Sequence, residues 1–293
     1  MFKSKTFGNV LVLDGVVQIT DFDEIAYQEP IAHIPLFSHA NPKKVLIIGG
    51  GDGGVIREVL RHDSVEEVHI CEIDQMVIDC GKKYFPHIAS AWDNPKVKLI
   101  CGDASVYIKA EENKGKFDVI VADTSDPVGP AAALFERPFY ADLAAALAPG
   151  GRVATQGESM WKDVQLIARL IAEVRAMNVF ETVEYATTQI PTYPLGQIGF
   201  IICGKASADA SVKTVSCKVP VRTVPEGFGL KYYTSELHSA AFVLPKFLQD
   251  VLSGGEVPAE FAGKYCAPAE QTARAAKESA EEVTHTDKKA KNA

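Results

Sequence analysis

Short apolar runs alternate with amphipathic segments along most of the chain. From Lys43 onward, each run typical of a buried strand is followed by a segment with helical spacing of its apolar residues, as in KKVLIIGG before GVIREVLRH. Parallel strands need such helical crossovers, so the alternation predicts an α/β sheet with helices on both faces. The expected parallel strands are KKVLIIGG, VEEVHICEID, KVKLICGD, FDVIVADTSD and RVATQGE.

Two further β-rich runs, VEYATTQIPTY and IGFIICGK, follow the long amphipathic segment WKDVQLIARLIAEVRAM. No helix separates these two runs, and we therefore expect an antiparallel hairpin that completes a mostly parallel, seven-stranded, Rossmann-like sheet. Another hairpin is expected over residues 5–20, where two β-rich runs flank Asp14-Gly15, a strong turn pair.

The remaining segments are less regular. We expect the helix FYADLAAALAPGG to be closed by Pro149-Gly150-Gly151, and LHSAAFVLPKFLQDVLS to be helical with a candidate break at Pro245. From about Ala267 the sequence is polar and Ala-rich, which is typical of a mobile or weakly helical tail. The sequence thus predicts an N-terminal β-hairpin domain over residues 1–30, an α/β domain over residues 31–266 and a polar tail over residues 267–293.

Composition and charge argue against several functional classes. The formal net charge is −8 and the body of the chain has no basic block, which opposes a nucleic-acid surface and suits a cationic ligand. The longest apolar runs are strand-sized, and no secretory pattern opens the sequence, so we expect no membrane span. The six cysteines are scattered without a CxxC pair or zinc-ligand spacing. We therefore expect a cytoplasmic protein with reduced cysteines and no metal site.

A carboxylate stands at or beside the end of every expected parallel strand. These acids are Asp52, Glu72 and Asp74, Asp103, Asp123 and Asp126, and Glu158. Helix N-caps explain some of them, but capping alone does not require an acid at all five strand ends. Because ligands of open α/β sheets bind beyond the carboxyl ends of the strands, we expect these acids to surround one site.

The glycine turn from Gly49 to Gly54 lets a ligand approach the backbone closely, although such a turn is weak evidence by itself. Glu72 follows about 20 residues later, where an acid can accept both ribose hydroxyls; a solvated strand end is the alternative. Asp52 opposes a dinucleotide, because a pyrophosphate at this turn would meet a like charge. An S-adenosyl compound, which carries a sulfonium and an amine, would be attracted. Asp103 is expected at the adenine end, or else as a helix cap.

The segment DTSDPVGPAAALF, Asp123 to Phe135, places two carboxylates three residues apart in a loop stiffened by prolines. An Asx-turn with a cap, or a divalent-ion site, would also use these two acids. Tyr27 and Gln28 in AYQEPIAH and Tyr193 in IPTYPLGQIGF offer aromatic and amide groups. Aromatic faces with carboxylates at the ends suit an aliphatic diamine, although Tyr27 could equally pack in the core. The histidines at 33, 39 and 238 are interpreted as structural.

At these residues the sequence resembles the polyamine aminopropyltransferases, and most closely those that make spermidine. The matching text runs in order over roughly residues 5–248: GNVLVLDGVVQITDFDEIAYQE, VLIIGGGDGGVIREVLRH, CEID, GDA, DTSDPVGPAAALF, QGESMW, IPTYPLGQIGF and YYTSELHSAAFVLP. The resemblance implies a methyltransferase-like sheet and a small N-terminal β-domain. We expect this β-domain to be partial relative to the family, since the sequence starts at what resembles its later strands, without the Trp and Gln that the upstream strands usually bring to the pocket.

The resemblance also implies a reaction and a set of roles. Decarboxylated S-adenosylmethionine would be the aminopropyl donor, as a co-substrate without a further cofactor, and putrescine the acceptor, in a homodimer. Asp123 would be the catalytic base. The donor nucleoside would be bound by Asp52 at its ammonium, Glu72 at its ribose and Asp103 at its adenine, together with Ala104, Gln28, Gly49 and Gly51. Putrescine would be bound by Tyr27, Asp126, Gln156 and Tyr193.

Three other functions are compatible with parts of this pattern. A putrescine N-methyltransferase would use intact S-adenosylmethionine, but Asp52 would repel the carboxylate of that donor. An NAD-dependent oxidoreductase would use the glycine turn, but Asp52 and the lack of a second nucleotide-binding half oppose it. A non-catalytic polyamine or nucleoside binding protein would not require the pair formed by Asp123 and Asp126.

Overall fold

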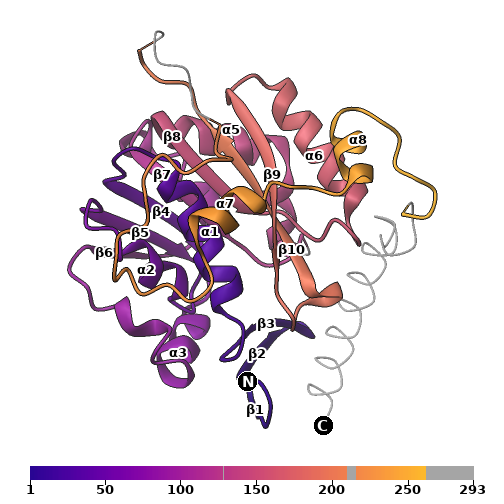
Figure 1. Cartoon of the computed structure of the whole chain (residues 1–293). Coiled ribbons are helices and arrows are strands. Elements are labelled where there is room, and N and C mark those ends of the chain that lie inside the picture. The colour runs from indigo at the N-terminus through magenta and orange to yellow at the C-terminus, as the bar shows by residue number, and fades with distance from the viewer. Residues whose placement is uncertain (128, 210–215, 262–293) are drawn as a thin grey trace, which may run out of the picture.

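The computed structural model describes residues 1–127, 129–209 and 216–261 (Figure 1). Within these residues the strands form a seven-stranded sheet with the order β6-β5-β4-β7-β8-β10-β9 and a three-stranded sheet with the order β1-β2-β3. In Figure 1 the smaller sheet lies below the larger one. The predicted C-terminal tail, residues 267–293, lies outside the described residues.

The order and direction of the strands in the large sheet confirm the mostly parallel α/β fold. The strands β4 to β8 run parallel to one another, and β10 pairs antiparallel with β8 and with β9, as expected of a terminal hairpin. The bounds are β4 (Lys44–Gly49), β5 (Glu67–Glu72), β6 (Val97–Cys101), β7 (Phe117–Asp123), β8 (Leu147–Gln156), β9 (Thr182–Gln189) and β10 (Gln197–Gly204).

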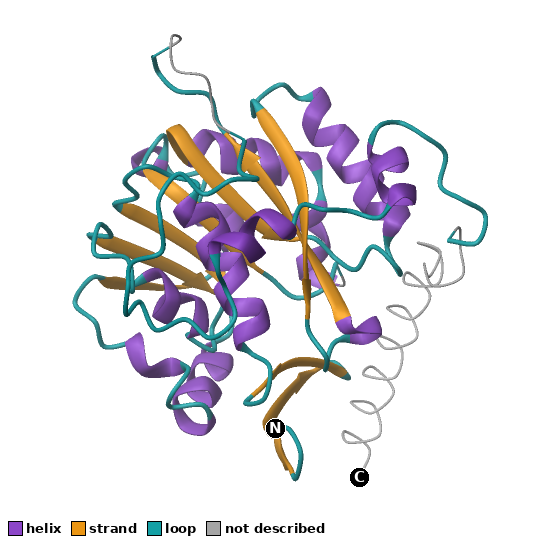
Figure 2. Ribbon diagram, viewed as in Figure 1, coloured by secondary structure: helices purple, strands orange, loops and turns teal. Residues whose placement is uncertain are grey.

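Helices cover both faces of this sheet, as Figure 2 shows. The α-helices are α1 (Ile25–Phe37), α2 (Gly54–Val59), α3 (Gln75–Tyr84), α4 (Ala104–Tyr107), α5 (Arg137–Ala146), α6 (Val164–Ala176), α7 (Ser235–Ala240) and α8 (Lys246–Leu252). Short 3-10 turns are η1 (Ala89–Ala91), η2 (Glu111–Asn113), η3 (Gly129–Phe135) and η4 (Pro194–Gly196). None of the helices within the described ranges combines the length and the apolar character that a bilayer-spanning helix needs.

The alternation of side chains along the strands creates a hydrophobic core on each face. On β4, Val45 and Ile47 pack in one core with residues of α1 and α2, while Leu46 and Ile48 pack in the other with residues of α5 and α6. Burial on both faces explains why the parallel strands are continuous apolar runs. These two cores hold the strand ends in place, and the strand ends in turn position the acids that follow them.

One predicted boundary is wrong. The helix α5 ends at Ala146, and β8 begins at Leu147, so Pro149-Gly150-Gly151 lies inside the strand and does not close the helix. The pairing with β7 shifts in register here, from Leu147 to Arg152. Gly150 has a φ of +79°, which glycine adopts without strain, so these residues form an irregularity in the strand. The break at Pro245 is confirmed, because that residue precedes α8 and separates it from α7.

The N-terminal hairpin is also confirmed. The strands β2 (Gly8–Leu13) and β3 (Val16–Thr20) pair antiparallel, and both turn residues, Asp14 and Gly15, have positive φ values as a two-residue hairpin turn requires. A further strand, β1 (Phe2–Ser4), which the sequence pattern did not predict, pairs with β2. The predicted boundary after residue 30 falls within α1, and the division of the chain into domains stays a prediction.

Candidate active site

A cavity of about 560 Å³ lies at the carboxyl ends of β4, β5, β7 and β8 and is bounded on one side by the N-terminal hairpin. Every site residue that the sequence predicted lines this cavity: Tyr27, Gln28, Gly49, Gly51, Asp52, Glu72, Asp103, Ala104, Asp123, Asp126, Gln156 and Tyr193. The acids that follow different strands are therefore brought together, as the parallel arrangement of the strands requires. The size suits small-molecule substrates.

The glycine turn between β4 and α2 is pressed against the end of β7. The N–H of Gly50 donates to the carbonyl oxygen of Asp123 at 3.1 Å. A Cβ atom at Gly49 would lie 2.1 Å from that same oxygen, and the φ of Gly49 is +75°. Only glycine fits at this position, so the sequence of the turn fixes how closely Asp52 and Asp123 approach across the cavity.

Asp52 is held by two hydrogen bonds to one of its oxygens. Its Oδ1 accepts from the backbone N–H of Gly54 and from Nε2 of Gln28, both at 2.7 Å. No donor among the described residues bonds to Oδ2, which leaves this oxygen to a ligand. Burial raises the pKa of Asp52 to about 6, and the charges of Glu24 and Glu72 act in the same direction.

Glu72 is the last residue of β5, and Asp103 follows the end of the neighbouring strand β6, on the same side of the cavity. Glu72 accepts from the N–H groups of Gly51 and Asp74 at 3.1 and 2.9 Å, and burial raises its pKa. Asp103 is exposed, and its Oδ1 accepts from the N–H of Ser105 at 2.7 Å, as the N-cap of α4. The cap interpretation of Asp103 is thus confirmed, and the same residue also lines the cavity.

Asp123 ends β7 next to an aromatic wall. The ring of Tyr27 lies 5.8 Å from that of Tyr193 and 5.6 Å from that of Phe200, measured between centroids. Burial and the charge of Asp52 raise the pKa of Asp123 to about 8, although a hydrogen bond with Tyr27 opposes this shift. Without ligands this carboxyl group is mostly protonated at neutral pH, and cations bound beside it would restore the carboxylate.

Tyr193 connects the opposite side of the cavity to the hairpin. Its hydroxyl donates to the carbonyl oxygen of Gln18 at 2.7 Å. Nearby, Asp23 accepts from both the backbone N–H and the hydroxyl of Thr192, at 2.8 and 3.0 Å. The loop between β9 and β10 is therefore fastened to the segment between β3 and α1. Tyr27 is only 6% exposed and packs in a hydrophobic core, so its core role and its place in the cavity wall coexist.

A second group of acids lines the same cavity: Glu158, which the sequence placed at a strand end without giving it a role, and Asp163, which was not predicted. Glu158 is 3% exposed, and burial raises its pKa to about 8, together with the charges of Asp126 and Asp163. Nε2 of Gln156 donates to Glu158 at 3.2 Å, and Lys162 lies 3.5 Å from Asp163. The text QGE after β8 was a visible signal for Glu158, but Asp163 lies at the start of α6, beyond any strand end.

Two family descriptions match the chain. The description "Spermine/spermidine synthase domain" matches residues 24–214, and "Spermidine synthase tetramerisation domain" matches residues 1–21. The chain belongs to the spermine/spermidine synthase family. This confirms the resemblance that the motifs indicated, because the two matched ranges contain most of those motifs.

In two related proteins of this family, about half of the aligned residues are identical to those of this chain. It is 51% identical to "Spermidine synthase" of Dictyostelium discoideum over 249 residues, which cover 84% of each protein. It is 48% identical to "Spermidine synthase 2" of Arabidopsis thaliana over 255 residues, which cover 86% of this chain and 74% of the relative.

A solved structure in the family has the same fold. The structure described as "Crystal Structure of Spermidine Synthase in Complex with Transition State Analogue AdoDATO" has a TM-score of 0.75 and 34% identity, covering 86% of this chain and 83% of the other. At 34% identity the two proteins are similar in sequence as well as in fold. It confirms the prediction of a Rossmann-like α/β sheet with a small N-terminal β-domain.

Two of the histidines that we interpreted as structural, His33 and His238, are buried and have partners within the protein. His33 is fully buried and lies 3.0 Å from His62 and 3.1 Å from Glu58, while His238 lies 2.5 Å from the hydroxyl of Tyr233. Within residues 1–127, 129–209 and 216–261, no cluster of His, Cys, Asp or Glu side chains has the arrangement to hold a metal ion. The five cysteines in those ranges are free thiols, at positions 71, 80, 101, 203 and 217.

Proposed function

We propose that this protein transfers the aminopropyl group of decarboxylated S-adenosylmethionine to putrescine, which yields spermidine and methylthioadenosine. The observation that carries the proposal is the pairing of Asp52 and Asp123 across one cavity, each with a raised pKa and no cationic side chain bonded to it among the described residues. Both substrates are cations, so the two acids recover their charge when the substrates bind.

The donor nucleoside would lie along the ends of β4, β5 and β6. In this arrangement Glu72 accepts the ribose hydroxyls and Asp103 and Ala104 contact the adenine, while Gly49 and Gly51 allow the close approach of the backbone. Asp52, supported by Gln28, would hold the ammonium of the aminopropyl chain through Oδ2. The depth of Glu72 and the exposure of Asp103 support this direction, since the adenine then lies nearer to the solvent.

Putrescine would lie between the aromatic wall and the second group of acids. The faces of Tyr27 and Tyr193 suit its methylene chain, and Asp126 and Gln156 suit its polar ends. An ammonium in water has a lysine-like pKa near ~10.4, so the attacking nitrogen must first lose a proton. Asp123 is the group that we propose accepts it, because it lines the cavity beside Tyr27 and the cationic substrates would return it to the carboxylate form, which can take up a proton.

The transfer step needs no further reactant. The neutral nitrogen attacks the methylene carbon next to the sulfonium, a C–N bond forms, and the C–S bond breaks with its electron pair going to sulfur. The positive charge of the sulfonium is thereby lost, and methylthioadenosine leaves as a neutral thioether. Since the sulfonium is already a good leaving group, positioning of the two substrates would supply much of the rate enhancement.

The experiment that tests this function offers the enzyme both donors, decarboxylated and intact S-adenosylmethionine, with putrescine, cadaverine and spermidine in turn. Mass spectrometry should find an added aminopropyl group on putrescine from the decarboxylated donor. Methylated putrescine from the intact donor would overturn the proposal in favour of an N-methyltransferase. That alternative is not favoured, because the named relatives are synthases and Asp52 would repel the donor carboxylate.

Three finer points belong to the same proposal. We propose a homodimer; the match of residues 1–21 to a tetramerisation domain and the exposed Phe2, Phe7 and Phe22 support self-association, and light scattering would distinguish a dimer from a tetramer or a monomer. We propose that no metal or other cofactor is needed, so that dialysis against EDTA leaves the rate unchanged. We propose a cytoplasmic location, supported by the free thiols and tested by cell fractionation.

A further inference from the structure

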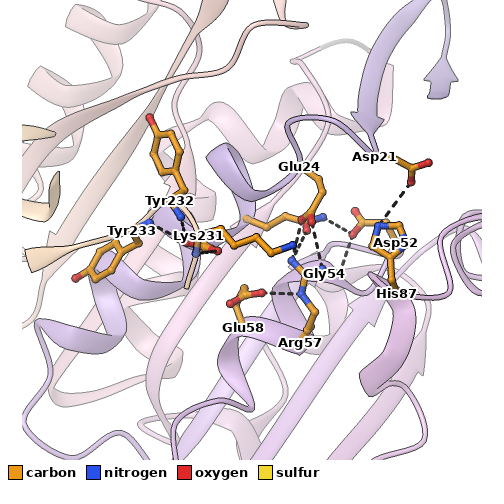
Figure 3. A network of polar contacts seen from close by, with 12 residues as sticks. Asp21, Glu24, Asp52, Gly54, Arg57, Glu58, His87, Lys231, Tyr232 and Tyr233 are labelled. Atoms are coloured by element: carbon orange, nitrogen blue, oxygen red, sulfur yellow. Dashed lines mark hydrogen bonds and ion pairs between the residues drawn. The ribbon is translucent and has the colours of Figure 1, made fainter. Parts of the chain in front are cut away.

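Behind Asp52, outside the residues that line the cavity, lies the guanidinium of Arg57 on α2. It donates to the carboxylate of Glu24 with both terminal nitrogens, at 2.8 and 3.3 Å, and its Nε donates to Glu58 at 2.6 Å. Figure 3 shows Arg57 beside these two acids, with Asp52 and Gly54 to the right of Arg57 in this view. Arg57 has one more contact, which reaches towards the site: its Nη2 donates to Oε1 of Gln28 at 3.3 Å.

This contact decides how the amide of Gln28 is oriented. Arginine has donors only, so the oxygen of the amide faces Arg57 and its nitrogen faces Asp52, to which it donates at 2.7 Å. The flipped amide would place NH₂ against the guanidinium and a carbonyl against a carboxylate, which are two repulsive contacts. Gln28 is 2% exposed, and a Cβ at Gly54 would lie only 2.0 Å from its amide, so the group has little other freedom.

We propose that Arg57 is a positioning residue for the donor: by fixing the Gln28 amide, it directs the hydrogen bonds of Asp52 to Oδ1 and keeps Oδ2 for the aminopropyl ammonium. This inference rests on the proposed function, because it takes that ammonium as the ligand of Asp52. The positive charge of Arg57 also lowers the pKa of Asp52, against the opposite effects of burial, Glu24 and Glu72, and so favours the carboxylate that a cation needs.

The test variant is Arg57→Lys, which keeps the charge but replaces a planar fork by a single ammonium. A lysine cannot reach Glu24, Glu58 and Gln28 together. Calorimetry measures the affinity of the full-length protein for two ligands: decarboxylated S-adenosylmethionine, and methylthioadenosine, which has the same nucleoside but no aminopropyl ammonium. Donor affinity should fall by roughly 10-fold or more, in line with the loss of a hydrogen bond to a charged group, while methylthioadenosine affinity stays within about twofold.

Arg61→Lys is the matched control. Arg61 also donates to Glu58, at 2.6 Å, and to the carbonyl of Phe228, but it does not contact Gln28. This variant disturbs the same buried acid, and we expect it to leave the ratio of donor to methylthioadenosine affinity unchanged. In the Gln28→Ala background, Arg57→Lys should add little to the loss of donor affinity, because the residue through which it acts is already gone.

The outcomes separate this inference from the proposed function. If Arg57→Lys weakens both ligands equally, or if Arg61→Lys changes the ratio as much, the role of Arg57 is structural and the inference is overturned. If Asp52→Asn leaves the ratio of the two affinities at the wild-type value, then Asp52 does not bind the ammonium, and the proposed donor site fails first. If Arg57→Lys does not fold, Glu24→Gln is the alternative, because it loosens the opposite side of Arg57. We expect this variant to lower donor affinity relative to methylthioadenosine affinity, by a smaller factor.

Discussion

Two carboxyl groups in this protein, the buried Glu58 and the half-buried Asp123, have opposite surroundings. Glu58 accepts from Arg57 and Arg61 at 2.6 Å and from His33 at 3.1 Å. Burial alone would raise its pKa, but His33 and Arg57 lower it to about 2. Asp123 faces another acid, Asp52, and a tyrosine, and its pKa is raised to about 8. A carboxylate that its own protein neutralises is structural, whereas one left without a cation suits a cationic ligand.

The group around Glu58 is complete without any ligand. Arg222 can only donate to Nδ1 of His62, at 3.1 Å, so the other nitrogen of His62 donates to His33, and His33 donates to Glu58. Each of these three hydrogen bonds, from Arg222 to Glu58, has a donor and an acceptor. Among the residues that the structure describes, no cationic side chain bonds to Asp52 or Asp123. Four experiments test this difference between the two regions, in order of decreasing expected effect.

The largest effect is expected from Asp123→Asn. The amide cannot accept the proton of putrescine, so kcat should fall by roughly 10²- to 10⁴-fold, the usual contribution of a general base. Mass spectrometry of spermidine formation measures the rate. Methylthioadenosine affinity serves as the control and should be retained. Turnover at the wild-type rate would remove Asp123 from the role of base.

The next effect is on stability and concerns the other carboxylate. Glu58→Gln leaves the half-buried Arg57 and Arg61 without this counter-charge, although Arg57 keeps Glu24, and the free energy of unfolding should fall by roughly 3 kcal/mol, the lower end of the range for a buried ion pair. Urea unfolding measures this loss. Asp123→Asn should cost no stability in the same assay, because it removes an acid that no cation of the protein compensates. Equal losses in the two variants would contradict the distinction between the two regions.

The third prediction concerns the pH dependence of stability without ligands. Because the pKa of Asp123 is raised from 3.8 to about 8, the folded protein retains a proton that the unfolded chain has already released. The associated stability is complete below pH 3.8 and is lost as the pH rises through about 8. Thermal unfolding over this range should show a steeper decline for the wild type than for Asp123→Asn. Parallel curves would show that Asp123 is not the group responsible.

The smallest effect is expected from Tyr193→Phe. The substitution removes the hydroxyl that donates to Gln18 at 2.7 Å but keeps the ring beside Tyr27. Without this hydrogen bond the ring is held less firmly in the cavity wall, and we expect the binding free energy of putrescine to weaken by about 0.5–1.5 kcal/mol. This loss corresponds to a rise of a few-fold in the KM for putrescine. Tyr140→Phe is a matched control, since it removes a hydroxyl that shares a hydrogen bond of 2.8 Å with the hydroxyl of Thr155, and neither residue lines the cavity. A rise in the KM for putrescine that is as large or larger in the control would show that the contact between Tyr193 and the hairpin has no special effect.

Much of the site could be predicted because strand ends are local features of the sequence. Asp52, Glu72, Asp103 and Asp123 each follow a run of apolar residues, and parallel strands must bring such positions to one edge. Asp163 and Arg57 could not be found in this way. Asp163 reaches the cavity only because α6 begins there, and Arg57 matters only through a contact between α1 and α2, which are far apart in the sequence.

The sequence by itself determined the order of strands and helices, the hairpin turn at Asp14-Gly15, the acidic edge of the sheet and the family to which the chain belongs. These features follow from hydrophobic periodicity, turn residues and short motifs, which act over a few neighbouring positions. The tertiary structure decided which acids are neutralised and which are not, because burial and the distances between charges depend on packing between distant segments. Glu58 and Asp52 lie six residues apart, and only the fold gives Glu58 two arginine partners and Asp52 an amide and a backbone N–H instead.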